Sequence, residues 1–362
     1  MKILLAGGGT AGHIEPALAV ARSLRKSQSS CELLFLGSKE GLETEIIPRA
    51  GFELFLIPKV KVPRRLTPTL LLTPFQLISA IRDTMRALSG VNAAIGFGGY
   101  ISAPLYIAAK LKHVPFLIHE QNAKPGIANR LGAYLTHHVA LSYRLKTGAL
   151  KKGVFTGIPL RQDVHIALQS ASRDWVAARV EAKKRITVKY GIDPALPIIF
   201  IFGGSQGSQA INSVIADSRT ILADSKFSVI HGVGKSNPLP SSDNSYVALN
   251  YITEMADLYL ASDIVIARSG AVTCAEVGAL ARFALFIPLP VGNGEQALNA
   301  APLVTSGRAQ LIRQSEFSPH WLQAHLSELA AQSRNAPSEG DVSAIDAADR
   351  IAAMVEKIAS VQ

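Results

Sequence analysis

The chain has 362 residues, of which 48% are hydrophobic and 18% are charged, so it is apolar enough to fold as about two domains and is not a disordered protein. Its two cysteines, Cys31 and Cys274, lie far apart in apolar stretches, which excludes a disulfide scaffold and indicates a reducing compartment. Residues 1–160 carry 20 Lys and Arg against 8 Asp and Glu, whereas residues 161–362 carry 17 against 19, so the first half is predicted to meet an anionic partner.

The N-terminal half alternates apolar runs with segments of helical spacing. Residues 2–6 are predicted to form a strand that ends in glycines, and residues 17–24 a helix. Continuous apolar strands between helices indicate a parallel sheet covered on both faces. Further strands are predicted at residues 33–36, 93–95 and 115–119, and further helices at residues 104–111 and 127–135.

No segment of the sequence has the length and polarity of a targeting or spanning element. The apolar N-terminus runs into glycines too early for a signal peptide. The apolar region 66–81 is interrupted by Pro68 and Pro74 and falls short of the ~20 residues needed to span a bilayer. We therefore expect neither element.

The strand, glycine turn and helix of the N-terminus recur 195 residues later. Residues 198–202 form an apolar run followed by Gly203-Gly204-Ser205-Gln206-Gly207 and a helix-like segment from Ala210. This repetition predicts two similar βαβ halves. The remaining predicted elements are strands at residues 227–230, 264–267 and 284–287, an exposed helix within residues 173–189 and a C-terminal amphipathic helix over residues 344–358.

Glycine-rich turns between strand and helix are the main functional motif. Such a turn points backbone N–H groups and the positive end of the helix dipole at one place, which suits a phosphate. The basic half has two of them, Gly8-Gly9-Thr10-Ala11-Gly12 and Gly96-Phe97-Gly98-Gly99-Tyr100. Tight α/β connections also require glycine for structural reasons alone. Two turns on one sheet favour a cradle for a diphosphate.

The sequence gives little support to several other types of site. Gly7, Gly9 and Gly12 fit G-x-G-x-x-G, but no acidic residue follows the second strand at Gly37 and Ser38, which weakens a dinucleotide-binding oxidoreductase. The Walker A pattern is incomplete, because Val229 stands where its first glycine is required. His119, His137 and His138 lack metal-ligand spacing with carboxylates, so a zinc site has little support.

Six sequence blocks occur together in one order. They resemble the MurG family of bacterial N-acetylglucosaminyltransferases, and the resemblance extends over nearly the whole chain. Ala11 and Ile158 differ from the residues common in that family. The blocks are Gly8-Gly9-Thr10-Ala11-Gly12-His13, Gly96-Phe97-Gly98-Gly99-Tyr100, His119-Glu120-Gln121-Asn122, Gly203-Gly204-Ser205-Gln206-Gly207, Arg268-Ser269-Gly270-Ala271 through Glu276, and Gln296 to Asn299.

The resemblance implies an α/β GT-B fold, in which two Rossmann-like domains have parallel sheets that face each other across a cleft. Residues 1–158 would bind the acceptor, lipid I, and the membrane, and residues 159–340 would bind UDP-GlcNAc. Residues 341–362 would form a helix that packs back on the N-terminal domain.

The implied reaction is the inverting transfer of GlcNAc from UDP-GlcNAc to the C4 hydroxyl of MurNAc in undecaprenyl-diphosphate-MurNAc-pentapeptide. The product is lipid II, used in peptidoglycan synthesis. The resemblance also implies a peripheral protein on the cytoplasmic face of the cell membrane, near other cell-wall synthesis proteins. No metal and no other cofactor is expected, and nucleic acid is not an expected partner.

For the donor, the resemblance implies that Ser205 and Arg161 contact the UDP phosphates, the backbone of Ile252 contacts uracil, and Glu276 binds the ribose hydroxyls. Short polar side chains suit the hydroxyls and acetamido group of GlcNAc. The expected donor set is Thr10, Ala11, Gly12, Asn122, Arg161, Ser205, Ile252, Ala271, Val272, Thr273, Glu276 and Gln296.

For the acceptor diphosphate, the expected residues are Gly8, Gly9, Gly98, Gly99 and Tyr100. His13 is the candidate general base, because imidazole titrates near neutral pH. It could instead stabilise its loop or bind acceptor phosphates, and Glu15 and Glu120 are the alternative bases.

Basic residues next to an apolar segment predict contact with an anionic membrane surface. These are Lys59, Lys61, Arg64 and Arg65, followed by Leu70 to Leu72 and a helical stripe of Phe75, Ile78, Ile81, Met85 and Leu88. Part of the stripe is expected to be core. Two rival functions stay open at this point: another GT-B sugar-nucleotide enzyme, transferase or epimerase, and a nucleic-acid-binding protein that uses the basic half.

Overall fold

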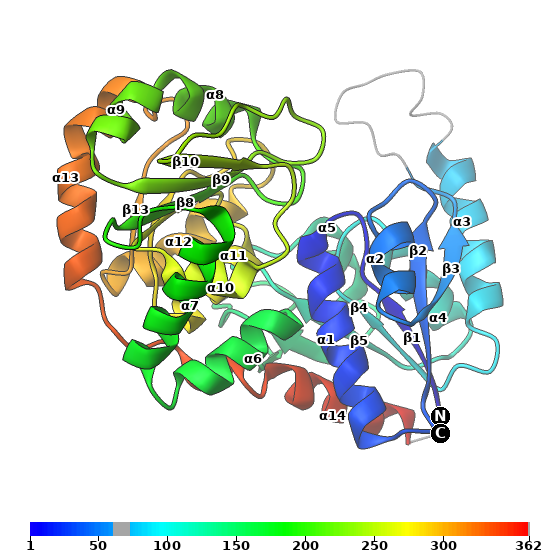
Figure 1. Cartoon of the computed structure of the whole chain (residues 1–362). Coiled ribbons are helices and arrows are strands. Elements are labelled where there is room, and N and C mark those ends of the chain that lie inside the picture. The colour runs from blue at the N-terminus through cyan, green and yellow to red at the C-terminus, as the bar shows by residue number, and fades with distance from the viewer. Residues whose placement is uncertain (61–72, 361–362) are drawn as a thin grey trace. The chain divides into compact units, whose positions relative to one another are not determined.

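The computed structural model describes residues 1–60 and 73–360, which form two compact α/β units. The first unit comprises Met1–Arg161 together with Asp346–Gln362, and the second comprises Gln162–Ile345. The chain therefore leaves the first unit after Arg161 and returns to it for its C-terminal helix (Figure 1).

A parallel sheet forms the centre of the N-terminal unit. Its order is β3-β2-β1-β4-β5-β6-β7, so β1 lies inside the sheet. Strands β2 and β3 are added on one side of β1, and the strand order then reverses, with β4 to β7 added on the other side. This order is that of a Rossmann fold, whose ligands bind beyond the carboxyl ends of the strands at the reversal. The strands are β1 (Lys2–Ala6), β2 (Glu32–Ser38), β3 (Glu53–Ile57), β4 (Ala93–Gly96), β5 (Phe116–Glu120), β6 (Val139–Leu141) and β7 (Val154–Phe155).

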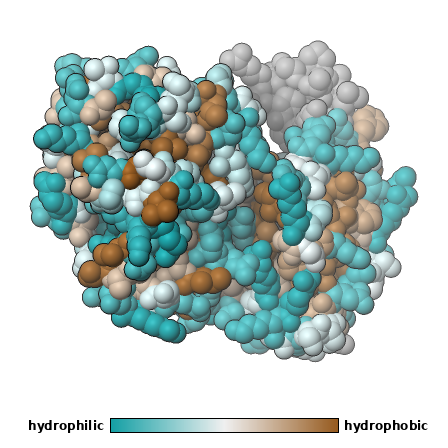
Figure 2. Space-filling model, in the orientation of Figure 1, coloured by the Kyte–Doolittle hydropathy of each residue, from teal (hydrophilic) through white to brown (hydrophobic). Residues whose placement is uncertain are grey.

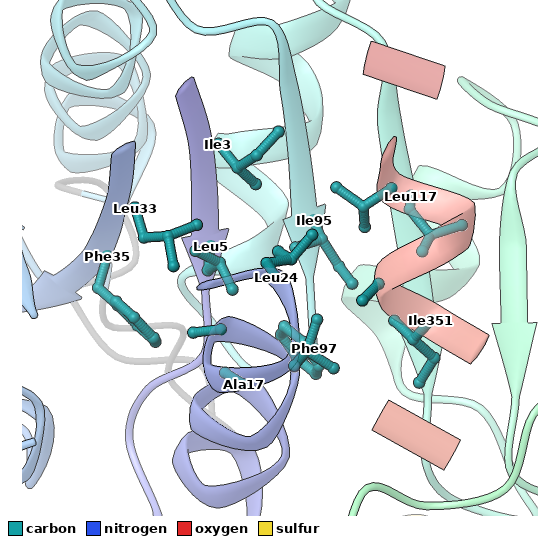
Figure 3. Close-up of a cluster of buried hydrophobic side chains, with 14 of the residues drawn as sticks. Ile3, Leu5, Ala17, Leu24, Leu33, Phe35, Ile95, Phe97, Leu117 and Ile351 are labelled. Atoms are coloured by element: carbon teal, nitrogen blue, oxygen red, sulfur yellow. The ribbon is translucent and has the colours of Figure 1, made fainter. Parts of the chain in front are cut away.

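Helices cover both faces of this sheet. On one face, α1 and the C-terminal α14 lie side by side (Figure 1). Figure 3 shows Ile351 of α14 in one buried cluster with Leu24 of α1 and with Leu5 and Ile95 of the sheet. The cluster on the other face includes Leu105 and Tyr106 of α4. The helices of the unit are α1 (Ala11–Ser27), α2 (Glu43–Arg49), α3 (Thr73–Ala87), α4 (Ser102–Leu111), α5 (Ile127–Gly132) and α14 (Ala347–Ala359).

The second unit repeats the same topology. Its parallel sheet has the order β10-β9-β8-β11-β12-β13, in which β8 takes the place that β1 has in the first sheet. All five residues of β8 are buried, as a strand covered on both faces requires. The strands are β8 (Ile198–Phe202), β9 (Ser228–Gly232), β10 (Tyr246–Leu249), β11 (Ile264–Ala267), β12 (Phe283–Phe286) and β13 (Ala309–Leu311).

Local sequence sets the ends of several helices in this unit. Asp174 and Ser318 cap α7 and α13 by accepting a backbone N–H of the first turn, and Gly191 ends α7 in the left-handed conformation. The helical elements are α6 (Gln162–Ala171), α7 (Trp175–Tyr190), α8 (Gln209–Asp217), α9 (Arg219–Asp224), α10 (Met255–Ala261), α11 (Ala271–Ala279), α12 (Glu295–Thr305), α13 (Pro319–Asn335) and the short 3₁₀ helix η2 (Val342–Ala344).

These observations confirm the predicted α/β architecture with two Rossmann-like sheets. Both cysteines are buried and free, as expected from their apolar surroundings. The face in Figure 2 is largely hydrophilic, and its apolar residues occur in small separate groups. Within residues 1–60 and 73–360, no helix has the length and hydropathy needed to cross a membrane.

Candidate active site

The two glycine turns of the N-terminal unit lie against each other. Strands β1 and β4 are neighbours in the sheet, so the turns that follow them meet at its carboxyl edge. A Cβ on Gly99 would lie 3.3 Å from the carbonyl oxygen of Gly8. Gly9, Gly98 and Gly99 all have positive φ, a conformation that disfavours other residues. The structure thus brings together the five residues expected at the acceptor, including Tyr100.

Glu43 fastens the first turn, and sequence reasoning missed it. This carboxylate is fully buried. Its Oε2 accepts the Gly9 N–H at 2.9 Å, and its Oε1 accepts both the N–H and the hydroxyl of Ser38 at 2.9 Å. The Tyr100 hydroxyl lies 2.6 Å from the Ser38 hydroxyl, which extends the network to the second turn.

No sequence pattern indicated Glu43, and only the structure shows how Gly41 makes room for it. Gly41 lies against its carboxylate, and a Cβ on Gly41 would lie within 2.2 Å of both carboxylate oxygens. No acidic residue follows the second strand directly. The chain supplies one five residues after Ser38, at the first position of α2, where its charge also favours the helix dipole.

His13 lies in the first turn of α1, facing the second glycine turn. Its Nε2 is 3.4 Å from the position that a Cβ on Gly98 would occupy, and its Nδ1 is 3.1 Å from the Thr10 hydroxyl. The protein packed around the ring lowers its pKa to about 4, although the charge of Glu43 acts in the opposite direction. The imidazole is therefore neutral near pH 7. In the tautomer whose Nδ1–H donates to the Thr10 hydroxyl, the Nε2 lone pair is available to accept a proton.

The two alternative bases have partners of their own. Glu120 is buried, and its carboxylate accepts four hydrogen bonds: the N–H and side-chain amide of Asn122, the Gly126 N–H, and the Asn129 amide. Burial raises its pKa, against the effect of these donors. Glu15 lies 3.5 Å from Arg161, in an ion pair. These contacts favour positioning roles for both carboxylates.

In the second unit, the turn after β8 is held by close backbone packing. A Cβ on Gly207 would lie 2.0 Å from the carbonyl oxygen of Val233, and Gly204 and Gly207 have positive φ. Ser208 caps α8 and accepts a hydrogen bond from Arg268 at 2.7 Å. The half-buried Ser205 lies inside this fixed turn.

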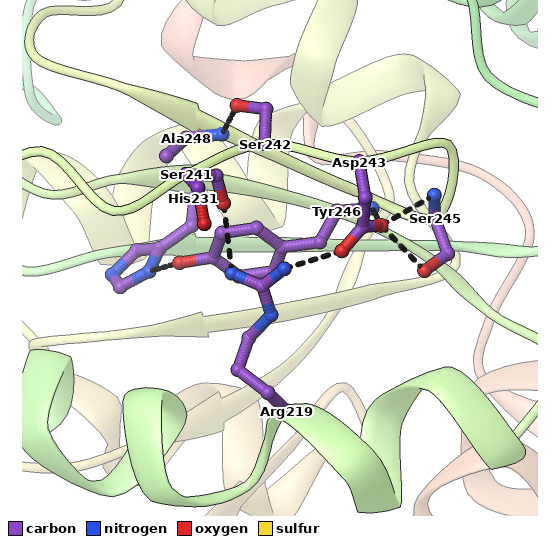
Figure 4. Close-up of polar contacts among 8 residues, drawn as sticks. All are labelled: Arg219, His231, Ser241, Ser242, Asp243, Ser245, Tyr246 and Ala248. Carbon is purple, nitrogen blue, oxygen red and sulfur yellow. Dashed lines mark hydrogen bonds and ion pairs between the residues drawn. The ribbon is translucent and has the colours of Figure 1, made fainter.

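Polar contacts around the buried His231 of β9 and Tyr246 of β10 extend to Arg219 of α9 (Figure 4). His231 Nε2 lies 3.1 Å from the Asn212 carbonyl, and the Asn212 amide donates to the Val233 carbonyl at 3.0 Å. This fixes the proton on Nε2, so His231 Nδ1 accepts from the Tyr246 hydroxyl at 2.6 Å. The Arg219 guanidinium stacks 3.7 Å from the centre of the Tyr246 ring. Burial lowers the pKa of His231 to about 4.

The remaining donor residues of the second unit lie at the carboxyl edge of its sheet or in the helices that follow. Glu276 is 3% exposed, so it is not a solvated surface charge, and its Oε2 accepts the Tyr259 hydroxyl at 2.9 Å. The Gln296 carbonyl accepts the Leu289 N–H at 3.0 Å. Ala271, Val272 and Thr273 form the first turn of α11, and the Ile252 side chain covers Gly232 at the end of β9.

The donor set predicted from sequence is divided between the two units. Thr10, Ala11, Gly12, Asn122 and Arg161 belong to the N-terminal unit, and the other seven residues belong to the second. Among residues 1–60 and 73–360, no group of three His, Cys, Asp or Glu side chains has the geometry to hold a metal ion.

The predicted membrane segment falls partly outside the described residues, which exclude Lys61, Arg64, Arg65 and Leu70 to Leu72. Lys59 pairs with Glu40 at 3.3 Å. The predicted apolar stripe on α3 is partly exposed and partly buried. Phe75 and Ile78 are 72% and 63% exposed, whereas Ile81, Met85 and Leu88 pack on the core, as was expected for part of it.

Two family models match the two units in chain order. Residues 3–141 match the N-terminal domain of glycosyltransferase family 28, and residues 198–354 match its C-terminal domain. With two Rossmann-like sheets and their glycine turns, these matches define a glycosyltransferase of the GT-B type.

Individual relatives narrow this class. The chain is 43% identical over 336 residues, 91% of this chain and 86% of the relative, to a UDP-N-acetylglucosamine–N-acetylmuramyl-(pentapeptide) pyrophosphoryl-undecaprenol N-acetylglucosamine transferase from Thermobifida fusca. The protein of that name from Corynebacterium diphtheriae is 43% identical over 323 residues, 88% of this chain and 84% of the relative. The chain therefore belongs to this transferase family, the MurG family.

Two solved structures have the same fold as this chain. The crystal structure of Acinetobacter baumannii MurG aligns with a TM-score of 0.68 at 25% identity, over 98% of this chain and 99% of that one. A UDP-GlcNAc 2-epimerase from Neisseria meningitidis reaches the same TM-score at 14% identity, over 99% of this chain and 100% of that one, and this likeness concerns the fold alone.

Proposed function

We propose that this chain transfers GlcNAc from UDP-GlcNAc to the C4 hydroxyl of MurNAc in undecaprenyl-diphosphate-linked MurNAc-pentapeptide, releasing UDP and forming lipid II. The printed names of its relatives support this substrate pair. The observation that carries the proposal is the joined pair of glycine turns in the N-terminal unit beside a neutral histidine. An epimerase acts on the sugar nucleotide alone and has no use for a second diphosphate site.

The N-terminal unit is assigned to the acceptor. The Gly9 N–H is taken by Glu43, and the other backbone N–H groups of the turns at Gly8 and at Gly98 and Gly99 can donate to a diphosphate, aided by the N-terminus of α1. The same anion would raise the pKa of nearby His13 from about 4 toward neutrality, because an opposite charge favours the imidazolium. His13 Nε2 then takes the proton of the attacking hydroxyl. Thr10 orients the ring through Nδ1.

The second unit is assigned to the donor. Ser205 would contact the UDP phosphates together with Arg161, the Ile252 backbone would contact uracil, and Glu276 the ribose hydroxyls. The N-terminus of α11, with Ala271 to Thr273, stabilises the negative charge of departing UDP. Asn122 and Gln296 read the GlcNAc ring. The N-terminus of α11 takes the place of the positive charge that a metal ion would otherwise supply, so neither a metal nor another cofactor is required.

Membrane attachment is assigned to the start of α3, where the exposed Phe75 and Ile78 lie. Apolar side chains next to a basic segment favour a peripheral position on an anionic bilayer. We place the enzyme on the cytoplasmic face of the membrane, where UDP-GlcNAc is available and where other cell-wall synthesis proteins can take over its product.

The test is the release of UDP from UDP-GlcNAc with and without a lipid I analogue, in buffer containing EDTA. The proposal predicts release that depends on the acceptor and equals the lipid II formed. Epimerisation of UDP-GlcNAc without acceptor, or no acceptor-dependent release, would overturn it.

A further inference from the structure

A pocket of about 530 Å³ lies in the N-terminal unit, away from the glycine turns. Its lining includes Pro115, His138 and Lys152, which precede β5, β6 and β7. These are the amino ends of the strands. The glycine turns follow the carboxyl ends of β1 and β4, so the pocket and the candidate active site lie at opposite edges of one parallel sheet.

The floor of the pocket is apolar and is closed by the C-terminal helix. Leu117, Val139 and Ile358 are buried, and Met354 is half-buried against the core. Helix α14 supplies both Met354 and Ile358. Six lining side chains are apolar in all: Pro115, Leu117, Val139, Val154, Met354 and Ile358. A volume within the range of about 300–1,000 Å³ with such a lining is typical of small-molecule sites.

The rim of the pocket is basic. Five lining residues carry side-chain nitrogen, namely His113, His137, His138, Lys152 and Lys357, and none of the lining residues is acidic. The pKa of His138 is lowered first by burial and then by the nearby charges of His137 and Lys357. Because no lining residue is acidic, an anion at the rim would meet Lys152 and Lys357 without a competing carboxylate in the lining.

We propose that this pocket binds a small anionic amphiphile, with its phosphate or carboxylate head at the Lys152 and Lys357 rim and its acyl chain on the apolar floor. The rim alone would attract any anion, and the floor alone any apolar molecule. Their combination at one site selects a ligand with both parts. A lipid drawn from a membrane and a soluble acyl phosphate share this chemistry.

The ligand would connect α14 to the sheet, because the pocket is shared between that helix and strands β5 to β7. It would stabilise the folded unit by mass action. Since the substrates are assigned to the opposite edge, it would not compete with either of them. The proposal is therefore independent of the transferase activity, and each can fail alone.

The test is calorimetric titration of the full chain with dodecyl phosphate below its micellar concentration. We expect saturable binding at one site, with inorganic phosphate and dodecanol each at least about tenfold weaker. Competition by phosphatidylglycerol vesicles would identify a membrane lipid as the source of the head and chain, and no competition would identify a soluble ligand.

Variants locate the binding. Charge reversal of both rim lysines, Lys152→Glu with Lys357→Glu, should raise the Kd at least about tenfold by replacing attraction with repulsion. Val154→Trp should do the same by filling the pocket, and Val154 is exposed enough to accept the larger ring without unfolding. Lys151→Glu is the matched control, since it reverses the same charge one residue outside the lining.

Three results would overturn the proposal. These are no saturable binding of dodecyl phosphate, an equal loss of affinity in Lys151→Glu, and inorganic phosphate binding as tightly as dodecyl phosphate, which would reduce the site to a general attraction for anions. Acceptor-dependent UDP release should be unchanged in the rim variants, which keeps this test separate from that of the proposed function.

Discussion

Glu43→Gln tests whether the buried carboxylate shapes the acceptor turn. The carboxylate accepts on both oxygens, from the Gly9 N–H on one and from Ser38 on the other. Glutamine keeps the volume but has a single acceptor oxygen, so its NH₂ must face one of these donors. One hydrogen bond is lost and a buried donor is left unsatisfied, at a cost of about 1–3 kcal/mol.

The expected result is a lower free energy of unfolding by that amount in urea, together with a higher KM for the lipid acceptor and an unchanged KM for UDP-GlcNAc. Glu45→Gln is the control on the same helix, since Glu45 forms a surface pair with Arg49 at 2.8 Å and such pairs contribute about 0.5 kcal/mol. The reasoning is refuted if Glu43→Gln keeps wild-type stability and acceptor KM, or if the control loses as much.

Three further predictions concern titration and the assigned roles. His119 and His231 are buried with a pKa of about 4, below the 6.5 of an exposed histidine, so the unfolded chain binds more protons and stability should fall as the pH drops from 6.5 toward 4. The loss should reach roughly 2 kcal/mol for each by pH 5, and ring-proton NMR titrations near pH 6.5 would contradict it. Glu276→Gln can still accept from Tyr259, so the fold should persist while the KM for UDP-GlcNAc rises about tenfold or more; an unchanged donor KM in initial-rate kinetics argues against ribose binding. His13→Gln should lower kcat by about 10²-fold or more with near-normal substrate binding, and normal turnover would remove His13 as the base.

The architecture was predictable because its strongest determinant is local. The β8 run Ile-Ile-Phe-Ile-Phe and the short apolar β1 are each followed by a glycine turn, and this pairing predicts the central strand of both sheets. Weaker elements were missed. Strand β3 has an exposed Glu53 and a half-buried middle, and β7 has only two residues, both exposed, so neither has the apolar pattern of a central strand.

The conformation of the glycine turns was predictable from the sequence. The glycine turns are visible in sequence because positive φ and close approach require glycine. Glu43 was not predictable, because its role depends on α2 folding back against the end of β2, a tertiary contact without a sequence pattern. The four hydrogen bonds to Glu120 were not predicted either. Their donors lie two to nine positions further along the chain, in the loop after β5 and in α5.

The central claim is that the glycine turn after β4, at Gly98 and Gly99, and the glycine turn after β8, at Gly203 to Gly207, hold different substrates. Initial-rate kinetics with both substrates varied, on Gly98→Ala in the N-terminal unit and Ser205→Ala in the second, test it most directly. We expect a higher acceptor KM with an unchanged donor KM for Gly98→Ala, because its positive φ is strained by a side chain, and the reverse for Ser205→Ala. If both variants raise the KM of the same substrate, the claim is contradicted.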